Sequence, residues 1–311
     1  MDAEHIRTSR MSGNMFCALA MIFFAAGFPA AQILLESSGV LALIFVRNAL
    51  GFVVLLAFLP LLERKTGLLD LPWLAGFRIG FLGFGLGSVM LLVAQSMSDA
   101  TTAALAVAAM PITAIGLEVI LDNRQLTIRF LLAVILVLLG GVLASGVMVH
   151  DLSVGTGFAV GLIGSGFFAW GSRQTVKKLP DLSPLSRTVV TTGGMVAFCL
   201  ICWIGAGFMG QSSATLSISN QSDIALLLIY SLLGLSISQV LWIKSVADIG
   251  VAIASFHLNA TPFYVMVIIF LFGGGWNWMQ TGGVLILIMG AVLAQLPEAR
   301  MKTIPDTAEP L

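Results

Sequence analysis

A few polar side chains interrupt a sequence that is otherwise strongly apolar, and their chemistry suits the binding of a solute. Arg47 and Glu118 lie inside two long apolar runs, and His257 and Asn259 lie inside a third. A charged group at the centre of a bilayer is costly, with Arg estimated at roughly 2.5–3.5 kcal/mol on insertion scales. Each of these residues is therefore a candidate for the site at which a membrane protein binds its substrate.

Arg47 lies eight residues into its apolar run, at a depth of about 12 Å if each helical residue rises by 1.5 Å. A guanidinium at this depth suits recognition of a substrate carboxylate or another anion. Two structural roles stay open, because the side chain can reach to the outer interface or can pair with Asp99 or Glu36. We predict Arg47 as a substrate-binding residue.

Glu118 lies about one helical turn from the inner end of its run. We predict it as a candidate proton-coupling carboxylate, with pairing to Arg124 or Arg129 as the structural alternative. His257 is the second proton-coupling candidate, because an imidazole titrates near neutral pH.

His257 and Asn259 are also predicted to bind substrate. Ser255 and Asn259 share one face of a helix at four-residue spacing, whereas His257 and Thr261 share another. At most one of these pairs can point squarely at a central site. A structural hydrogen bond is the alternative role for each of them.

Two amides and two indoles complete the predicted substrate-binding set. Gln95 and Gln239 lie in apolar runs, and Trp170 and Trp242 are placed where an indole can stack on a planar solute. Packing is the alternative for both tryptophans. The pair Cys199 and Cys202 is interpreted as packing, because its neighbours are apolar.

These residues must be positioned by membrane helices. The chain of 311 residues is 58% hydrophobic and 10% charged, with a mean hydropathy of +1.03. A spanning helix needs roughly 20 apolar residues, and such continuous runs indicate helices. We predict ten spans at residues 14–35, 39–62, 74–97, 101–121, 128–149, 154–176, 185–209, 224–245, 251–272 and 279–296.

The positive charges predict the orientation of these spans. With the N-terminus inside, every Lys and Arg except Arg47 falls at the cytoplasmic side, which indicates that both termini are cytoplasmic. The first run follows Arg7 and Arg10 as a signal peptide would, but it is longer than a signal core and nine further spans follow, so we expect it to be retained.

A duplication relates the two halves of the chain. Pro111 and Pro262 lie 151 residues apart in apolar segments, and the LLGGVLA that begins at Leu138 is echoed by IMGAVLA from Ile288. Five spans per half is an odd number, so the second half enters the membrane in the opposite sense. We predict an all-α integral membrane protein with ten transmembrane helices as two inverted five-helix repeats around a central cavity, with repeats at 1–149 and 150–296 and a cytoplasmic tail at 297–311.

At this point the sequence resembles the EamA-type branch of the drug/metabolite transporter superfamily, from Asn14 to Leu296. The resemblance is carried by Arg47, by AALAVAAMP ending at Pro111, by Leu126-Thr127, by LLGGVLA and by ASFHLNATP before Pro262. It implies ten helices in two repeats, a central cavity and the movement of small metabolites, often outward. One departure is Asn123-Arg124, where the family usually has a Gly-Glu pair.

The sequence therefore predicts a secondary transporter in the cytoplasmic (inner) membrane that moves an amino-acid-like or vitamin-like metabolite by alternating access and acts as an exporter. The alternatives are an intramembrane enzyme, for which no zinc, serine-elbow or paired-aspartate motif is seen in the sequence, and a membrane assembly subunit that does not transport. The expected partners are a small-molecule substrate and the bilayer. No cofactor, metal or nucleic acid is expected, and the oligomeric state is left open.

Overall fold

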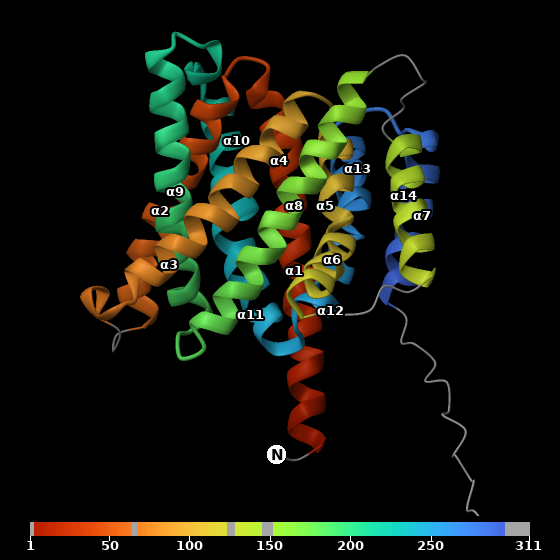
Figure 1. Cartoon of the computed structure of the whole chain (residues 1–311). Helices are drawn as coiled ribbons and strands as arrows, with labels where there is room; N and C mark the ends of the chain where they lie inside the picture. The colour runs from red at the N-terminus through yellow and green to blue at the C-terminus, as the bar shows by residue number, and fades with distance from the viewer. Residues whose placement is uncertain (1–2, 64–66, 123–127, 145–151, 296–311) are drawn as a thin grey trace, which may run out of the picture.

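The computed structural model describes residues 3–63, 67–122, 128–144 and 152–295, and this part of the chain is helical, with no strand (Figure 1). The prediction of an all-helical protein is confirmed. The predicted tail at 297–311 and the Leu126-Thr127 pair lie outside these residues.

The first half of the chain forms two long helices, two interrupted ones and a shorter one. The second of the interrupted helices breaks at Ala109, two residues before Pro111. A proline causes such a break because it lacks the N–H that a helix interior requires and clashes with the preceding turn. The elements are α1 (Ala3–Leu35), α2 (Val40–Leu62), η1 (Leu68–Asp70), α3 (Trp73–Ile79) continued by the π-helix η2 (Gly80–Gly85) and α4 (Leu86–Ser96), α5 (Ala100–Ala108), α6 (Met110–Asp122) and α7 (Ile128–Ala144).

The second half repeats this pattern of helices and interruptions. Its third long helix again contains a π-helix, and its fourth again breaks just before a proline, at Asn259 and Ala260 before Pro262. The elements are α8 (Leu152–Lys178), α9 (Pro184–Phe208), η3 (Ser212–Ala214), α10 (Gln221–Leu228) continued by the π-helix η4 (Ile229–Ile237) and α11 (Ser238–Ile249), α12 (Val251–Leu258), α13 (Thr261–Leu271) and α14 (Trp278–Gln295).

Side-chain caps mark several helix starts. The Asp99 carboxylate accepts the Thr102 N–H at 2.7 Å at the start of α5, and Ser183 and Asn220 cap α9 and α10 in the same way. Such caps satisfy backbone donors that have no partner within the helix. They lie in the loops between apolar runs, where the sequence predicted the helix ends.

Six helical stretches of the described chain are long and apolar enough to cross a membrane: Met11–Leu35, Val40–Leu62, Trp73–Ser96, Ala100–Leu121, Pro184–Phe208 and Gln221–Ile249. The chain is therefore a multi-pass membrane protein. The other four predicted spans fall on α7, α8, α12 with α13, and α14. The total of ten spans stays a prediction.

The most extensive helix packing joins the two halves of the chain, and it does so reciprocally. Helix α4 packs on α8 as α1 packs on α11, η2 packs on α9 as η4 packs on α2, and α6 packs on α8 as α13 packs on α1. Helices α7 and α14, which close their respective halves, pack on each other and stand together at one side of the molecule (Figure 1). The halves are interleaved rather than side by side.

Glycines permit the closest of these approaches. A Cβ on Gly27 would lie 3.3 Å from the Gly234 Cα, and a Cβ on Gly83 would lie 2.6 Å from the Gly171 Cα. Helices that meet through small residues can bring their backbones into contact. The glycines of GFGLG, at residues 83–87, thus serve helix packing.

Candidate functional site

Two adjoining cavities lie at the junction of the halves, with volumes of about 30 and 40 Å³. They share Phe24, Leu91, Phe168 and Gln239, which come from α1, α4, α8 and α11. We call them the first and the second cavity.

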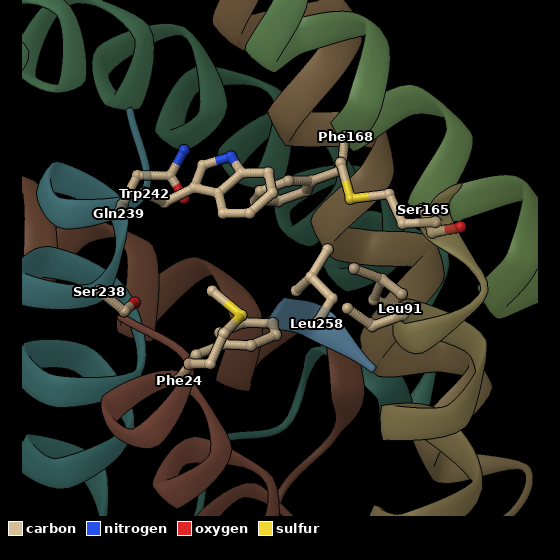
Figure 2. Close-up of a pocket in the computed structure, with 11 residues that line it drawn as sticks. Phe24, Leu91, Ser165, Phe168, Ser238, Gln239, Trp242 and Leu258 are labelled. Carbon is tan, nitrogen blue, oxygen red and sulfur yellow. The ribbon is translucent and has the colours of Figure 1, made fainter. Parts of the chain in front are cut away.

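The first cavity is lined mainly by aromatic and other apolar side chains. Figure 2 shows Trp242 and Phe168 along one side of it and Phe24 on the opposite side. The remaining lining residues are Met21, Leu91, Val107, Met110, Ser165, Ser238, Gln239 and Leu258. A planar, largely apolar solute fits such walls, because aromatic side chains offer large flat surfaces.

Three polar side chains line this first cavity, and Gln239 is the one without a protein partner. The Ser165 hydroxyl donates to the Leu162 carbonyl at 2.7 Å, and the Ser238 hydroxyl donates to the Leu235 carbonyl at 3.2 Å. The Gln239 amide, although only 7% exposed, has no hydrogen bond to the described residues. Its amide group is therefore available to a bound solute.

Trp242 is held in a fixed orientation at the wall of the cavity. Its indole N–H donates to the Ser172 hydroxyl at 2.9 Å, and that hydroxyl donates to the Phe168 carbonyl at 2.9 Å. Because the polar edge of the indole is satisfied by α8, an apolar face remains for contact with a solute.

Arg47 lines the second cavity, and three of its five N–H groups donate to the protein. Nε donates to the Tyr230 carbonyl at 3.3 Å, Nη2 to the Gly234 carbonyl at 2.8 Å and Nη1 to the Asn48 Oδ1 at 3.2 Å. The guanidinium carbon lies 4.5 Å from the centre of the Tyr230 ring. Among the described residues Arg47 forms no ion pair, so the suggested pairing with Asp99 or Glu36 is absent.

Gln95 also lines the second cavity, and it links two helices. Its amide nitrogen donates to the Phe28 carbonyl at 2.7 Å and to the Gln32 Oε1 at 3.3 Å. The amide thus joins α4 to α1 within the first half. Its carbonyl oxygen has no hydrogen-bond donor among the described residues.

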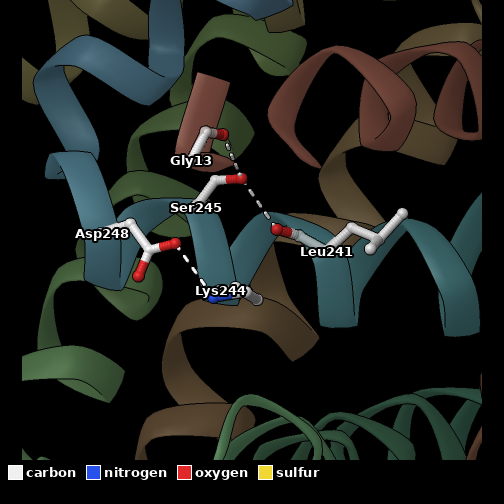
Figure 3. Close-up of polar contacts among 5 residues, drawn as sticks. All are labelled: Gly13, Leu241, Lys244, Ser245 and Asp248. Atoms are coloured by element: carbon white, nitrogen blue, oxygen red, sulfur yellow. Dashed lines mark hydrogen bonds and ion pairs between the residues drawn. The ribbon is translucent and has the colours of Figure 1, made fainter. Parts of the chain in front are cut away.

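His257 lies outside both cavities, at the end of the helix bundle where α1 begins (Figure 1). Its Nε2 is 3.0 Å from the Asn14 Oδ1, which joins α12 to α1. Nearby on α1, the Gly13 carbonyl accepts the Ser245 hydroxyl of α11 at 3.0 Å, as Figure 3 shows. In the same figure Lys244 and Asp248 pair at 3.0 Å on α11. The His257 and Ser245 contacts hold the two halves together at this end of the bundle.

Three other predicted site residues are not brought to the cavities. Asn259 is buried at the break between α12 and α13, and its Oδ1 has no partner within the described chain, but it lines neither cavity. Glu118 lies partly buried on α6 and has an interaction of its own. Trp170 lines an apolar groove with Leu117 and Phe167, on the face of α8 opposite to Ser165 and Phe168.

The sequence analysis missed the residues that shape the first cavity most. Phe24 and Phe168 were not singled out, although each directly precedes a short motif with glycine, AAG at 25–27 and AWG at 169–171. The sequence could have indicated Phe24 and Phe168, because they occupy equivalent places in the two halves. The serines Ser165 and Ser238 carried no such signal.

Comparison with known proteins finds a family that the first half of the chain resembles. The EamA-like transporter family, which is part of the drug/metabolite transporter superfamily, matches residues 11–146. The match covers less than half of the 311 residues, so it is a likeness of the first half to this family. That the chain transports a small molecule and is not an enzyme stays a prediction, which this likeness supports.

Solved structures share the fold of this chain. One of them, titled only "Crystal structure of protein", has a TM-score of 0.68 at 15% sequence identity, with 92% of this chain and 97% of that chain covered. At this identity the likeness shows the fold alone. A search of the curated proteins finds no match.

Proposed function

We propose that this protein is a secondary transporter that carries a small, uncharged and largely apolar organic solute through the central cavities by alternating access. The observation that carries the proposal is the first cavity, whose aromatic walls come from both halves and whose one unpartnered polar group is the Gln239 amide. A site between two halves that can rock against each other is the usual construction of such transporters.

Within the predicted substrate classes, this geometry favours a planar, vitamin-like solute over an amino-acid-like one. Arg47 already donates three of its five N–H groups to two backbone carbonyls and an amide, which leaves it a weaker partner for a substrate carboxylate than a guanidinium without protein partners. A charged solute placed between Phe24, Phe168 and Trp242 would lose its hydration without an opposite charge in return.

The proposal includes two inverted five-helix repeats, at residues 1–149 and 150–296. Support comes from the reciprocal packing of the helices, from the π-helices η2 and η4 at equivalent places, and from the two breaks before Pro111 and Pro262. The placement of Lys and Arg supports an inner-membrane orientation with both termini in the cytoplasm. Outward transport is proposed from the family resemblance.

Counterflow in liposomes tests the transport proposal. Purified protein is reconstituted and loaded with unlabelled solutes from a panel of vitamins, nucleobases, aromatic alcohols and amino acids, and the uptake of each labelled counterpart is measured. We expect counterflow of an uncharged planar solute. Movement of no solute above empty vesicles would contradict transport, and movement of anionic solutes alone would contradict the proposed substrate class.

A further inference from the structure

Among the described residues each half has one π-helix, and the second helix of the other half contacts it. Helix α2 packs on η4, and α9 packs on η2. π-Helical turns are rare and are often found at functional sites, because they insert an additional residue into a helix. The two contacts can be compared residue by residue.

Arg47 on α2 and Phe198 on α9 occupy equivalent positions in these contacts. They lie 151 residues apart, as Pro111 and Pro262 do. Arg47 contacts Tyr230 and Gly234 of η4, and Phe198 contacts the residues that precede these by 149 positions, Phe81 and Gly85 of η2. The correspondence therefore holds for both partners at once.

The chemistry of the two contacts differs. The Phe198 ring meets the Phe81 ring edge to face at 5.0 Å, and a Cβ on Gly85 would lie 2.6 Å from the Phe198 Cβ, so this contact is apolar. Arg47 instead donates to the Tyr230 and Gly234 carbonyls and lies over the Tyr230 ring. An aromatic side chain packs there at a lower desolvation cost than a guanidinium does.

The costly group therefore requires a role of its own, and the carbonyls that it binds identify that role. Both belong to η4, and a guanidinium presents its N–H groups in a fixed planar fork, so the two hydrogen bonds fix where these carbonyls lie. If η4 relaxed to a regular α-helix by the loss of one residue from its π-turn, the following residues would turn by about 100°. Gln239 and Trp242 follow η4 directly and line the first cavity.

We infer that Arg47 is a positioning residue that holds η4 in its π-helical register and so keeps Gln239 and Trp242 directed into the first cavity. Arg47 is also linked to the other π-helix, η2, through two further side chains. Asn48 accepts from Arg47 and donates to the Ser88 hydroxyl at 3.4 Å, and Ser88 donates to the Gly85 carbonyl at 3.0 Å. One chain of hydrogen bonds thus joins η4 and η2. The inference rests on the proposed function for the importance of the cavity, but its test needs no transported solute.

The test measures where residue 239 points. Gln239→Cys is made in protein whose native cysteines are replaced by Cys17→Ala, Cys199→Ser and Cys202→Ala. The rate at which a small, membrane-permeable maleimide labels residue 239 is then measured in three proteins, which have Arg, Phe or Lys at position 47. Arg47→Phe places at this position the residue type that Phe198 has in the equivalent contact with η2. We expect the labelling rate to fall by about tenfold in Arg47→Phe and by less in Arg47→Lys, because thiol reactivity depends on access.

Ser165→Cys on α8 is the matched control, because it lines the same cavity but does not follow η4. Its labelling should be the same with all three residues at position 47. Equal labelling of Gln239→Cys with Arg47 and with either variant would overturn the inference, and so would a fall at Ser165→Cys of the same size.

Hydrogen exchange gives a second readout that needs no access to the cavity. In Arg47→Phe or, if that variant does not accumulate, in Arg47→Lys, the amides of η4 should exchange about tenfold faster while those of η2 stay unchanged, because exchange reports local opening. Unchanged exchange in η4 would overturn the inference. If the counterflow experiment alone failed, the labelling and exchange experiments would still test the role of Arg47. That failure would contradict the transport proposal and not this inference.

Discussion

At the scale of single residues, a polar group in the membrane serves either the protein or a solute, and its hydrogen bonds distinguish the two. Arg47, Gln95 and His257 all have protein partners, whereas the Gln239 amide has none among the described residues. Of the predicted polar residues, we therefore assign solute binding to Gln239 first.

Replacing Gln239 by a side chain of similar size without polar atoms isolates this role. Gln239→Leu should raise KM for the transported solute by ~2–10-fold, which corresponds to the loss of one hydrogen bond worth about 0.5–1.5 kcal/mol. KM is measured by counterflow at several solute concentrations. An unchanged KM would remove Gln239 from the binding site.

The two tryptophans provide a matched pair. Trp242→Ala should raise KM by ~2–10-fold or more, since an aromatic contact contributes about 0.5–1.5 kcal/mol beyond its buried area. Trp170→Ala, on the outward face of α8, should leave KM unchanged. Equal effects of both substitutions would indicate that the cavity with Trp242 is not the binding site.

At the scale of elements, the helices are positioned by glycines at contacts where no side chain fits. A Cβ on Gly80 would lie 1.8 Å from the Thr191 carbonyl oxygen of α9, whereas a Cβ on Gly116 would meet nothing within 4 Å. Both glycines lie in helical segments, so the sequence alone does not separate them. The difference comes from the partner helix.

Gly80→Ala should lower the free energy of unfolding by about 1–3 kcal/mol, because the backbone of α9 must move. Gly116→Ala should leave it unchanged or raise it by up to about 1 kcal/mol, because Ala favours a helix over Gly. Thermal unfolding of the detergent-purified variants measures both. Similar melting temperatures for the two variants would show that the contact of η2 with α9 is less close than described.

At the scale of the whole molecule, the two halves are joined at the end of the bundle where α1 begins, by contacts of α1 with α11 and α12. The Ser245–Gly13 and His257–Asn14 hydrogen bonds both belong to this group. The proposed alternating access requires the two sides of the cavity to open in turn. We therefore expect these contacts to separate during each transport cycle.

A cross-link between α1 and α12 tests that expectation. Asn14→Cys with His257→Cys, in protein without native cysteines, should stop transport when oxidised and regain it when reduced. Counterflow before oxidation, after oxidation and after reduction is the measurement, and each single cysteine variant is the control. Full transport by the cross-linked protein would contradict movement at this contact.

Sequence reasoning predicted the helices well, and the site only partly, for physical reasons. Apolar runs fix helices locally, so the predicted spans fall on helices, although the breaks before Pro111 and Pro262 were not predicted. Which face of a helix meets a cavity depends on its partners, so Trp170 and Trp242 looked alike in sequence and lie in different places. The π-helices η2 and η4 were not predicted, because they shift the helical phase without a distinct residue signal.

The interleaving of the halves has a consequence for biogenesis. The main partners of α1, α2 and α4 are α11, α9 and α8, all of which the ribosome synthesises later. During translation, the helices of the first half must therefore wait in the lipid without their final contacts. A nascent chain that stops after residue 149 would expose the small-residue faces at Gly27 and Gly83 to lipid, and we expect quality-control proteases of the membrane to remove it.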